Sequence, residues 1–313
     1  MGMQAIPVQQ RSTYWARLSK RRDRIGSILT IVPSLVAIAV FVYGFIIWNG
    51  VVSLSKWSGI VADYSWNGFQ NYLALFNTQR FQIDCLNMLV FSLVFIGGCT
   101  LVGLLLAILL DQNIRGESIF RGIFLCPMAI ALVVTGVIWS WLLSPGNAVT
   151  GYLGINQLLA WLNLKCFTSG WYTDQRIGIS AVALAGIWQL SGYIMAIFLT
   201  ALRGIPAELR EAARIDGATE PQIYRYIILP NLNPVILGNV IVLGHMSLKV
   251  FDLVAAMTGP GRGFCTDVPA YYMWDTAFRG NNFNSGAAIG MVLLIAVSVL
   301  VIPYLIYLRR SEA

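Results

Sequence analysis

Long stretches without charged residues constrain this chain more than any other feature of its sequence. A helix needs about twenty apolar residues to cross the hydrocarbon core of a bilayer, and a chain in lipid must satisfy its own backbone hydrogen bonds. Charged residues make up only 11% of the 313 residues, against about 25% in soluble domains. We therefore predict an all-α membrane protein with about six transmembrane helices. The predicted spans are Ile28–Gly50, Leu86–Leu110, Gly122–Leu143, Ile177–Leu202, Val235–Val254 and Ser285–Leu308.

The distribution of Lys and Arg predicts the orientation of these spans. If both termini lie in the cytoplasm, 14 of the 21 basic residues fall on the cytoplasmic side, six lie outside and one, Lys249, lies within a span. Basic residues favour cytoplasmic loops, so we expect this orientation in a cytoplasmic (inner) membrane. The net charge of +7 follows this sidedness and attracts lipid headgroups, which argues against nucleic-acid binding.

The composition divides the chain into three parts. Residues 1–24 are polar and basic, and we expect them to form a cytoplasmic tail. Residues 25–84 comprise the first span and an outer loop rich in aromatic side chains, which settle at membrane interfaces. Residues 85–310 are expected to form a core of five helices, interrupted by a polar segment at residues 205–230. Pro127 is expected to kink the third span.

The polar segment is predicted to form two short helices with a sharp corner between them. Gly217 suits a helix C-terminus, where the backbone needs a positive φ. Thr219 and Gln222 have the spacing of a capping box, which predicts the start of a second helix. Pro230 and Pro234 are expected to end that helix before the next apolar run.

Such a helical corner at a membrane surface forms a small projection that can enter a groove on a partner. Packing between helices explains its alanines equally well from the residues alone. A resemblance favours docking. The order Glu211-Ala212-Ala213, Asp216-Gly217-Ala218 and Leu229-Pro230 is similar to the signature loop of permease subunits of binding-protein-dependent ABC importers. In that family the loop forms the coupling helix, which docks on the ATPase subunit.

The resemblance runs from about residue 28 to 310 and implies the fold of a type I ABC importer permease with a cytoplasmic coupling helix. It places Glu211, Ala212, Ala213 and Gly217 in the docking loop, with Asp216 supporting the corner. It also implies three kinds of partner: a second homologous permease subunit, two ATPase subunits and an extracytoplasmic solute-binding protein. ATP and Mg would bind to the ATPase subunits, because this chain has no Gly-Lys-Ser/Thr sequence. It would be a non-catalytic subunit that binds no cofactor.

Further segments resemble the sugar-uptake branch of these permeases, of the maltose and glucose type. They are Ile187-Trp188-Gln189, Lys249-Val250-Phe251-Asp252-Leu253 and Met257-Thr258-Gly259-Pro260-Gly261. A monosaccharide such as glucose or mannose is the expected substrate, and an oligosaccharide or a glycosidic osmolyte is the alternative. The family often has Gly-Gly-Pro where this chain has Gly259-Pro260-Gly261, and the loop from Ala148 to Arg176 matches no pattern, so the docking surface for the binding protein is not assigned.

Polar side chains in the fourth span are candidates for the solute pathway. Trp188, Gln189 and Tyr193 lie within it. Polar groups at membrane depth are costly unless they line a cavity or bond to a neighbouring helix. Both explanations stay open for these three residues.

The fifth span carries a polar stripe. His245, Lys249 and Asp252 recur at i, i+4 and i+7, which places them on one face of a continuous helix. Lys249 and Asp252 are then spaced to pair. One interpretation is an ion pair at the outer end of the helix, with Lys249 extending to the interface. The other is a polar wall of the translocation pathway, with His245 nearest the solute.

Other classes of protein fit the sequence less well. A self-sufficient secondary transporter is expected to show an internal repeat and an ion relay, and the sequence offers only the polar stripe of the fifth span. A membrane enzyme is disfavoured by a single histidine and by five cysteines without metal-binding spacing. A bridge between Cys166 and Cys265 is possible but nothing in the sequence supports it. A channel is expected to show a charged ring or a filter-like repeat.

Overall fold

The computed structural model describes residues 31–112, 114–147, 149 and 151–311, so the tail predicted at residues 1–24 lies outside the described residues. Five helical segments are long and apolar enough to cross a membrane, and a bent pair of helices brings the number of candidate spans to six. This confirms the predicted class of fold. The five single segments are Ile31–Ser53, Gln79–Asp111, Gly178–Arg203, Glu220–Leu248 and Phe283–Tyr307.

These spans are built from the following helices. The first contains the π-helix η1 (Ala39–Gly44) and α2 (Phe45–Ser53), and the next four are α4 (Gln79–Asp111), α8 (Gly178–Arg203), α11 (Leu229–Leu248) and α14 (Phe283–Ser311). The bent pair consists of α5 (Glu117–Leu125) with the 3-10 turn η2 (Cys126–Ala129), and α6 (Leu132–Leu142).

The remaining elements are shorter; those within Glu220–Leu248 begin that span, and the others connect the spans. They are α3 (Gln70–Asn77), α7 (Gly154–Trp161), η3 (Lys165–Phe167), η4 (Trp171–Thr173), α9 (Ala207–Ile215), α10 (Glu220–Ile223), the π-helix η5 (Tyr224–Ile228), α12 (Asp252–Met257), η6 (Arg262–Phe264), α13 (Pro269–Trp274) and the π-helix η7 (Asp275–Arg279). All five cysteines are free thiols, so Cys166 and Cys265 do not form a disulfide.

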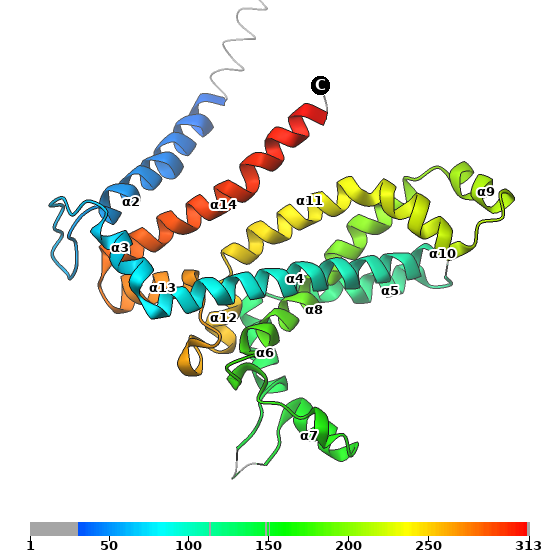
Figure 1. The fold of residues 1–313 in the computed structure, drawn as a ribbon, viewed down its shortest axis with the longest axis horizontal. Helices are drawn as coiled ribbons and strands as arrows, with labels where there is room; N and C mark the ends of the chain where they lie inside the picture. Colours follow the sequence, from blue (N-terminus) through cyan, green and yellow to red (C-terminus); the bar gives the residue numbers. More distant parts are fainter. Residues whose placement is uncertain (1–30, 113, 148, 150, 312–313) are drawn as a thin grey trace, which may run out of the picture.

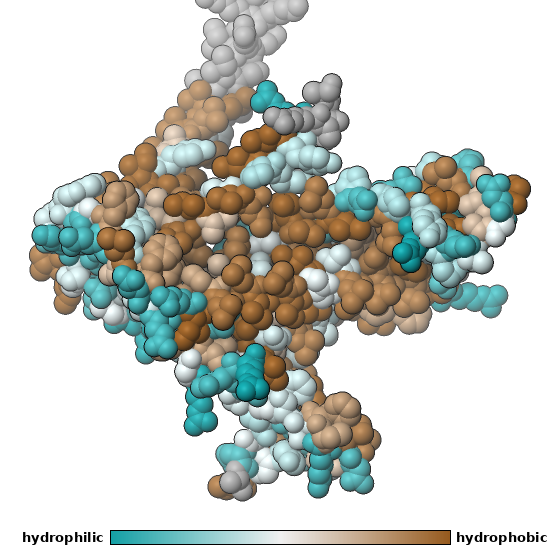
Figure 2. Space-filling view, in the orientation of Figure 1, coloured by the Kyte–Doolittle hydropathy of each residue, from teal (hydrophilic) through white to brown (hydrophobic). Residues whose placement is uncertain are grey.

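The long helices α4, α8 and α11 run along the length of the molecule (Figure 1), with α9 and α10 at one end and α3 and α13 at the other. We call these the α9 end and the α13 end. Small residues bring α4 and α8 together: a Cβ built at Gly103 would lie 2.7 Å from Cγ2 of Ile194. Apolar residues cover the middle of the molecule and polar residues gather at its ends (Figure 2), as expected for helices in lipid.

The third span is broken rather than kinked at its proline. Its two halves meet at 97°, and the break falls after Pro127, where Ile130 and Ala131 adopt extended conformations with ψ of 136° and 141°. Two consecutive extended residues end the pattern of helical hydrogen bonds. Sequence reasoning placed the distortion at Pro127, but that residue lies within the 3-10 turn before the break.

The prediction that Pro230 and Pro234 end the second helix of the polar segment is wrong. The α10 helix continues through η5 into α11, and Pro234 lies inside α11. A π-helical turn directly before Pro230 changes the hydrogen-bond pattern where the proline lacks an N–H. Nearby, Asn231 Nδ2 donates a hydrogen bond to the Ile227 carbonyl at 2.7 Å.

The fifth span ends earlier than predicted. The α11 helix stops at Leu248, Lys249 has a φ of −116° and a ψ of 22°, and α12 begins at Asp252 after an unwound segment. The predicted stripe from His245 to Asp252 is therefore not one helix face. The ion pairs among the described residues do not include one between Lys249 and Asp252.

Candidate functional site

The polar segment forms the predicted corner at the α9 end. Gly217 has a φ of 82°, which favours glycine. Its N–H donates to the Arg214 carbonyl at 3.1 Å, and the Ala218 N–H donates to the Ala213 carbonyl at 2.9 Å, which is the Schellman pattern for ending a helix. The capping box of Thr219 and Gln222 then starts α10.

Most of α9 is exposed. Ala213 is buried against the bundle, whereas the side chains of Glu211 and Ala212 lie on the surface. Two apolar side chains are also exposed, Leu209 at 44% and Ile215 at 86%. An exposed helix that mixes small, apolar and charged residues and projects from the end of the bundle (Figure 1) has the composition of a surface that a partner covers.

A partly buried ion pair holds α9 against the bundle. Arg210 Nη1 donates to Asp111 Oδ2 at 2.8 Å and Arg210 Nη2 donates to the Leu202 carbonyl at 3.3 Å. Arg214 Nε pairs with Glu220 Oε1 at 2.8 Å across the corner. Sequence reasoning did not single out Arg210 or Asp111. Their signal in the sequence was weak, because an arginine in a polar segment and an aspartate at the end of a span are individually ordinary.

A cavity of about 480 Å³ lies between α9 and the rest of this end of the bundle. Its lining is polar and carries both signs of charge: Asp111, Gln112, Ala207, Arg210, Glu211, Arg214, Glu220 and Tyr224. A second ionic group is centred on Glu117, which pairs with Arg121 and, at 2.7 Å, with Arg203. Helix ends that are tied together by charge can move as a unit.

The candidates in α8 have structural partners. Gln189 is buried, and its Nε2 donates to the Ile130 carbonyl at 2.6 Å, where the third span is broken. Bonding to a neighbouring helix was one of the two explanations that the sequence allowed for Gln189, and the structure shows such a bond. Trp188 contacts Trp139 edge to face, with ring centroids 6.0 Å apart, and Tyr193 is half-buried.

Lys249 and Asp252 share a cavity of about 280 Å³. The other lining residues are Phe91, Phe95, Leu132, Gly186, Leu190, Met246, Val250, Phe251 and Leu253. The cavity is therefore largely apolar, with the two charged residues at the unwound segment between α11 and α12. His245 is half-buried in α11 and does not line this cavity. Of the predicted pathway residues, the structure brings Lys249 and Asp252 together here.

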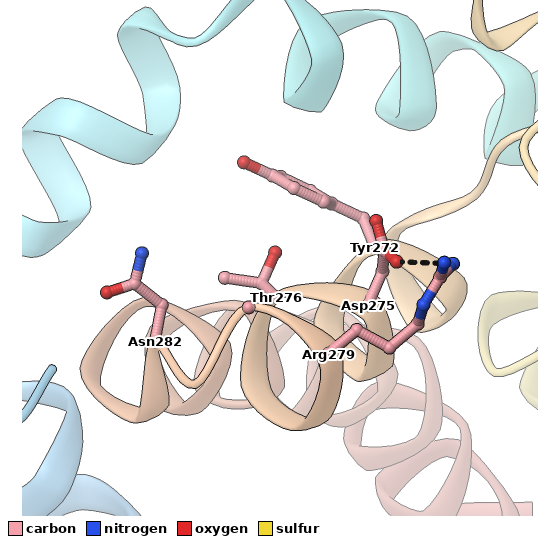
Figure 3. Close-up of a pocket in the computed structure, with 6 residues that line it drawn as sticks. Tyr272, Asp275, Thr276, Arg279 and Asn282 are labelled. Carbon is pink, nitrogen blue, oxygen red and sulfur yellow. Dashed lines mark hydrogen bonds and ion pairs between the residues drawn. The ribbon is translucent and has the colours of Figure 1, made fainter. Parts of the chain in front are cut away.

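A third cavity, of about 540 Å³, opens at the α13 end. Its lining residues are Tyr272, Asp275, Thr276, Arg279, Gly280 and Asn282. Figure 3 shows the side chains of Thr276 and Asn282 on the same side of the helix as the ring of Tyr272, with Asp275 paired to Arg279 at 3.1 Å. Burial raises the pKa of the Tyr272 hydroxyl above its ordinary value.

The arrangement is that of a helical membrane protein with an exposed surface helix, a polar cavity at each end and a largely apolar cavity among the helices between them. No group of three or more His, Cys, Asp or Glu in the described part of the chain could hold a metal ion.

Comparison with known proteins identifies the family. Residues 99–312 match the binding-protein-dependent transport system inner membrane component, and the chain belongs to this family. It is 40% identical to a probable ABC transporter permease protein of Pyrococcus horikoshii over 91% of this chain and 96% of that protein. It is 35% identical to the xylose/arabinose import permease protein XacH of Haloferax volcanii over 75% of this chain and 73% of that protein.

A solved structure has the same fold. It is the crystal structure of a bacterial ABC transporter involved in the import of the acidic polysaccharide alginate, and it matches with a TM-score of 0.76 at 22% identity, over 94% of this chain and 99% of that chain. The protein is thus a multi-pass membrane permease, the non-catalytic transmembrane component of a binding-protein-dependent ABC transporter. The family binds no cofactor itself.

Proposed function

We propose that this chain translocates a sugar as one permease subunit of an ATP-driven importer, with α9 as the coupling helix. The observation that carries the proposal is the exposed α9 corner. It presents Glu211, Ala212 and Gly217 on the surface while Arg210 fixes the helix to the bundle. Asp216 and Gly217 also line an open pocket at the corner, which a partner side chain can enter.

The assembly and the orientation are parts of the same proposal. Two ATPase subunits would bind at the α9 end, a second homologous permease would pack along the helices, and a solute-binding protein would dock at the α13 end. The α9 end is then cytoplasmic, together with both termini. The excess of Lys and Arg in the loops assigned to that side supports this orientation.

The solute pathway is proposed to be centred on the cavity that Lys249 and Asp252 line. Trp188, Gln189, Tyr193 and His245 would contribute to its walls when the second permease completes the pathway. A charge within a membrane protein normally faces its interior, and the unwound backbone between α11 and α12 resembles the broken helices that form solute sites in other transporters.

A monosaccharide is the proposed substrate. The sequence segments that resemble sugar permeases support it, and the import of xylose and arabinose by a 35% identical relative is consistent with a monosaccharide. Aromatic rings and amides such as those of Trp188 and Gln189 suit a neutral polyhydroxylated solute.

Co-purification tests the central proposal. The tagged chain is expressed together with its native partner subunits and purified in mild detergent, and we expect an ATPase subunit to accompany it. Changing Glu211→Arg together with Gly217→Asp should release the ATPase, whereas Ser298→Ala, a change on α14 outside the corner, should not. Isolation of this chain alone, active in liposomes without ATP, would overturn the proposal.

A further inference from the structure

A group of charged side chains is buried at the α13 end, where the start of α4 meets the loop before α13. Arg80 donates from Nε to Asp267 Oδ2 at 2.7 Å and from Nη1 to Asp275 Oδ2 at 2.8 Å. Its guanidinium also lies over two aromatic rings, 4.9 Å from the centroid of Phe264 and 4.3 Å from that of Tyr272. The arginine is thus held from several directions at once.

Asp84 lies one helical turn beyond Arg80 and is fully buried. Asp84 lies between Arg80 and Asn87 on the face of α4 that bonds to Asp267, and Asp267 is also fully buried. Asp267 is satisfied by Arg80 and by the Val268 N–H at 2.9 Å. Neither oxygen of Asp84 receives a hydrogen bond from any donor. An ionised carboxylate in this position would be buried, unpartnered and next to a second negative charge, all of which are costly.

The charges around Asp84 cancel without any charge on Asp84 itself. Arg80 and Asp267 form one pair, and Asp275 is shared between Arg80 and Arg279, which lies 3.1 Å from it. The two positive and two negative charges already cancel. An ionised Asp84 would add a fifth charge without a partner. The titratable and charged groups that face this site are Arg80 and Cys85 on α4, Asp267 on the loop, Tyr272 on α13 and Asp275 on η7.

We propose that Asp84 carries a proton at neutral pH and donates it in a hydrogen bond to Asp267, so that the two carboxyls form a buried proton-binding site. The shared proton supplies the donor that Asp84 lacks and removes the unbalanced charge. Burial raises the pKa of Asp267 in spite of the opposing effect of Arg80, which is the environment that a shared proton requires.

The site clamps α4 to the loop at residues 264–268. Asn87, nearly one turn beyond Asp84, donates from Nδ2 to the carbonyls of Phe264 at 2.8 Å and Asp267 at 2.9 Å. Arg80, Asp84 and Asn87 therefore form one face of α4 that holds this loop. Loss of the proton would place two adjacent carboxylates in the clamp and would weaken it.

The sign of the pH dependence follows from proton counting. In the unfolded chain an aspartate ionises near pH 4, whereas the folded chain keeps one proton more. The free energy of unfolding therefore falls as the pH rises above that value, and it stops falling once the folded pair has lost its proton. In the folded chain, the ratio of pairs that have lost the shared proton to pairs that keep it grows about tenfold with each further pH unit.

Infrared difference spectroscopy of the purified full-length chain tests the proposal. Between neutral and alkaline pH, the wild type should lose a carbonyl band of a protonated carboxylic acid. Asp84→Asn should show no such band and a nearly pH-independent melting temperature, because the amide is a permanent donor to Asp267. The control Asp63→Asn, at an exposed loop carboxylate, should keep the band. An unchanged band in Asp84→Asn would overturn the proposal.

A second variant guards against a failure of Asp84→Asn to fold. In Asp267→Asn the charges balance with Asp84 ionised, and the amide at position 267 can donate to it. This variant should therefore also lack the band while Asp84 is still present. If Asp267→Asn keeps the wild-type band, the proton does not belong to this pair. The measurement needs no partner subunit, so its outcome is independent of the proposed transport function.

Discussion

Arg210 of the surface helix α9 donates a hydrogen bond to Asp111, the last residue of α4, across 2.8 Å. The two residues are 99 positions apart in the sequence. The Asp111 side chain is 8% exposed and that of Arg210 is 22% exposed, so water screens this pair less than it screens a surface ion pair. Because α4 continues to the α13 end (Figure 1), the contact connects the proposed coupling helix to the full length of the molecule.

Removing the arginine should loosen α9. In Arg210→Ala the carboxylate of Asp111 loses its charged donor in a partly buried place, which costs about 1.5–3 kcal/mol. We expect hydrogen exchange of the α9 backbone amides, measured by mass spectrometry, to become about 10- to 100-fold faster because local opening is easier by that amount.

The neighbouring Arg214 provides a matched control. Its partner is Glu220, and both side chains are 56% exposed, so the pair is worth about 0–1 kcal/mol. Exchange in Arg214→Ala should stay within a few-fold of the wild type. The exchanged pair Arg210→Asp with Asp111→Arg should recover part of the protection. Equal acceleration by Arg210→Ala and Arg214→Ala would contradict this role of Arg210.

Gly217→Asp is expected to abolish solute-driven ATP hydrolysis in the assembled importer while the chain still inserts into the membrane. At this corner φ is 82° and a built Cβ meets nothing within 4 Å. A new side chain therefore costs backbone strain and projects outward, where the proposed ATPase binds. Asparagine and aspartate both tolerate this φ better than other residues.

Comparison with Gly217→Asn separates charge from strain. Both variants should melt near the wild-type temperature, and the asparagine variant should keep more of the solute-stimulated ATPase activity because it adds no charge. If Gly217→Asp transported at the normal rate, α9 would not be the coupling element.

Local and periodic features of this fold could be predicted from the sequence. The spans follow from runs of apolar residues, and the corner at Gly217 follows from a glycine, a capping box and short-range hydrogen bonds. The breaks at Ile130 and at Lys249 could not be predicted, because they depend on contacts with other helices. The Ile130 carbonyl is satisfied by Gln189, 59 residues away in the sequence.

The buried charges show a further limit. Charged residues such as Arg80 and Asp84 served as boundaries for the second predicted span, which was expected to start at Leu86, whereas α4 begins at Gln79. The helix can include them because Asp267, 187 residues from Arg80, neutralises the arginine. A partner so distant in the sequence leaves no local signal.

The charged residues at the unwound segment should affect transport more than stability. Asp252→Asn and Lys249→Met each remove one charge from the cavity at the unwound segment while keeping most of the side-chain volume. We expect solute transport in proteoliposomes to fall about tenfold or more, which corresponds to about 1.4 kcal/mol or more, with basal ATP hydrolysis unchanged. Ser298→Ala on α14, which does not line this cavity, should transport normally. Normal transport by both charge variants would exclude this cavity from the pathway.

Two glycines should respond to alanine with opposite signs. A Cβ at Gly192 in α8 would collide with the carbonyl oxygen of Phe124 in α5, so Gly192→Ala forces the helices apart at a cost of about 1–3 kcal/mol. A Cβ at Gly97 in α4 meets nothing within 4 Å. Gly97→Ala should therefore stabilise the helix by about 0.5–1 kcal/mol. Thermal unfolding of the purified chain in detergent should move down for the first variant and up for the second. Equal shifts would mean that α5 and α8 do not approach this closely at Gly192.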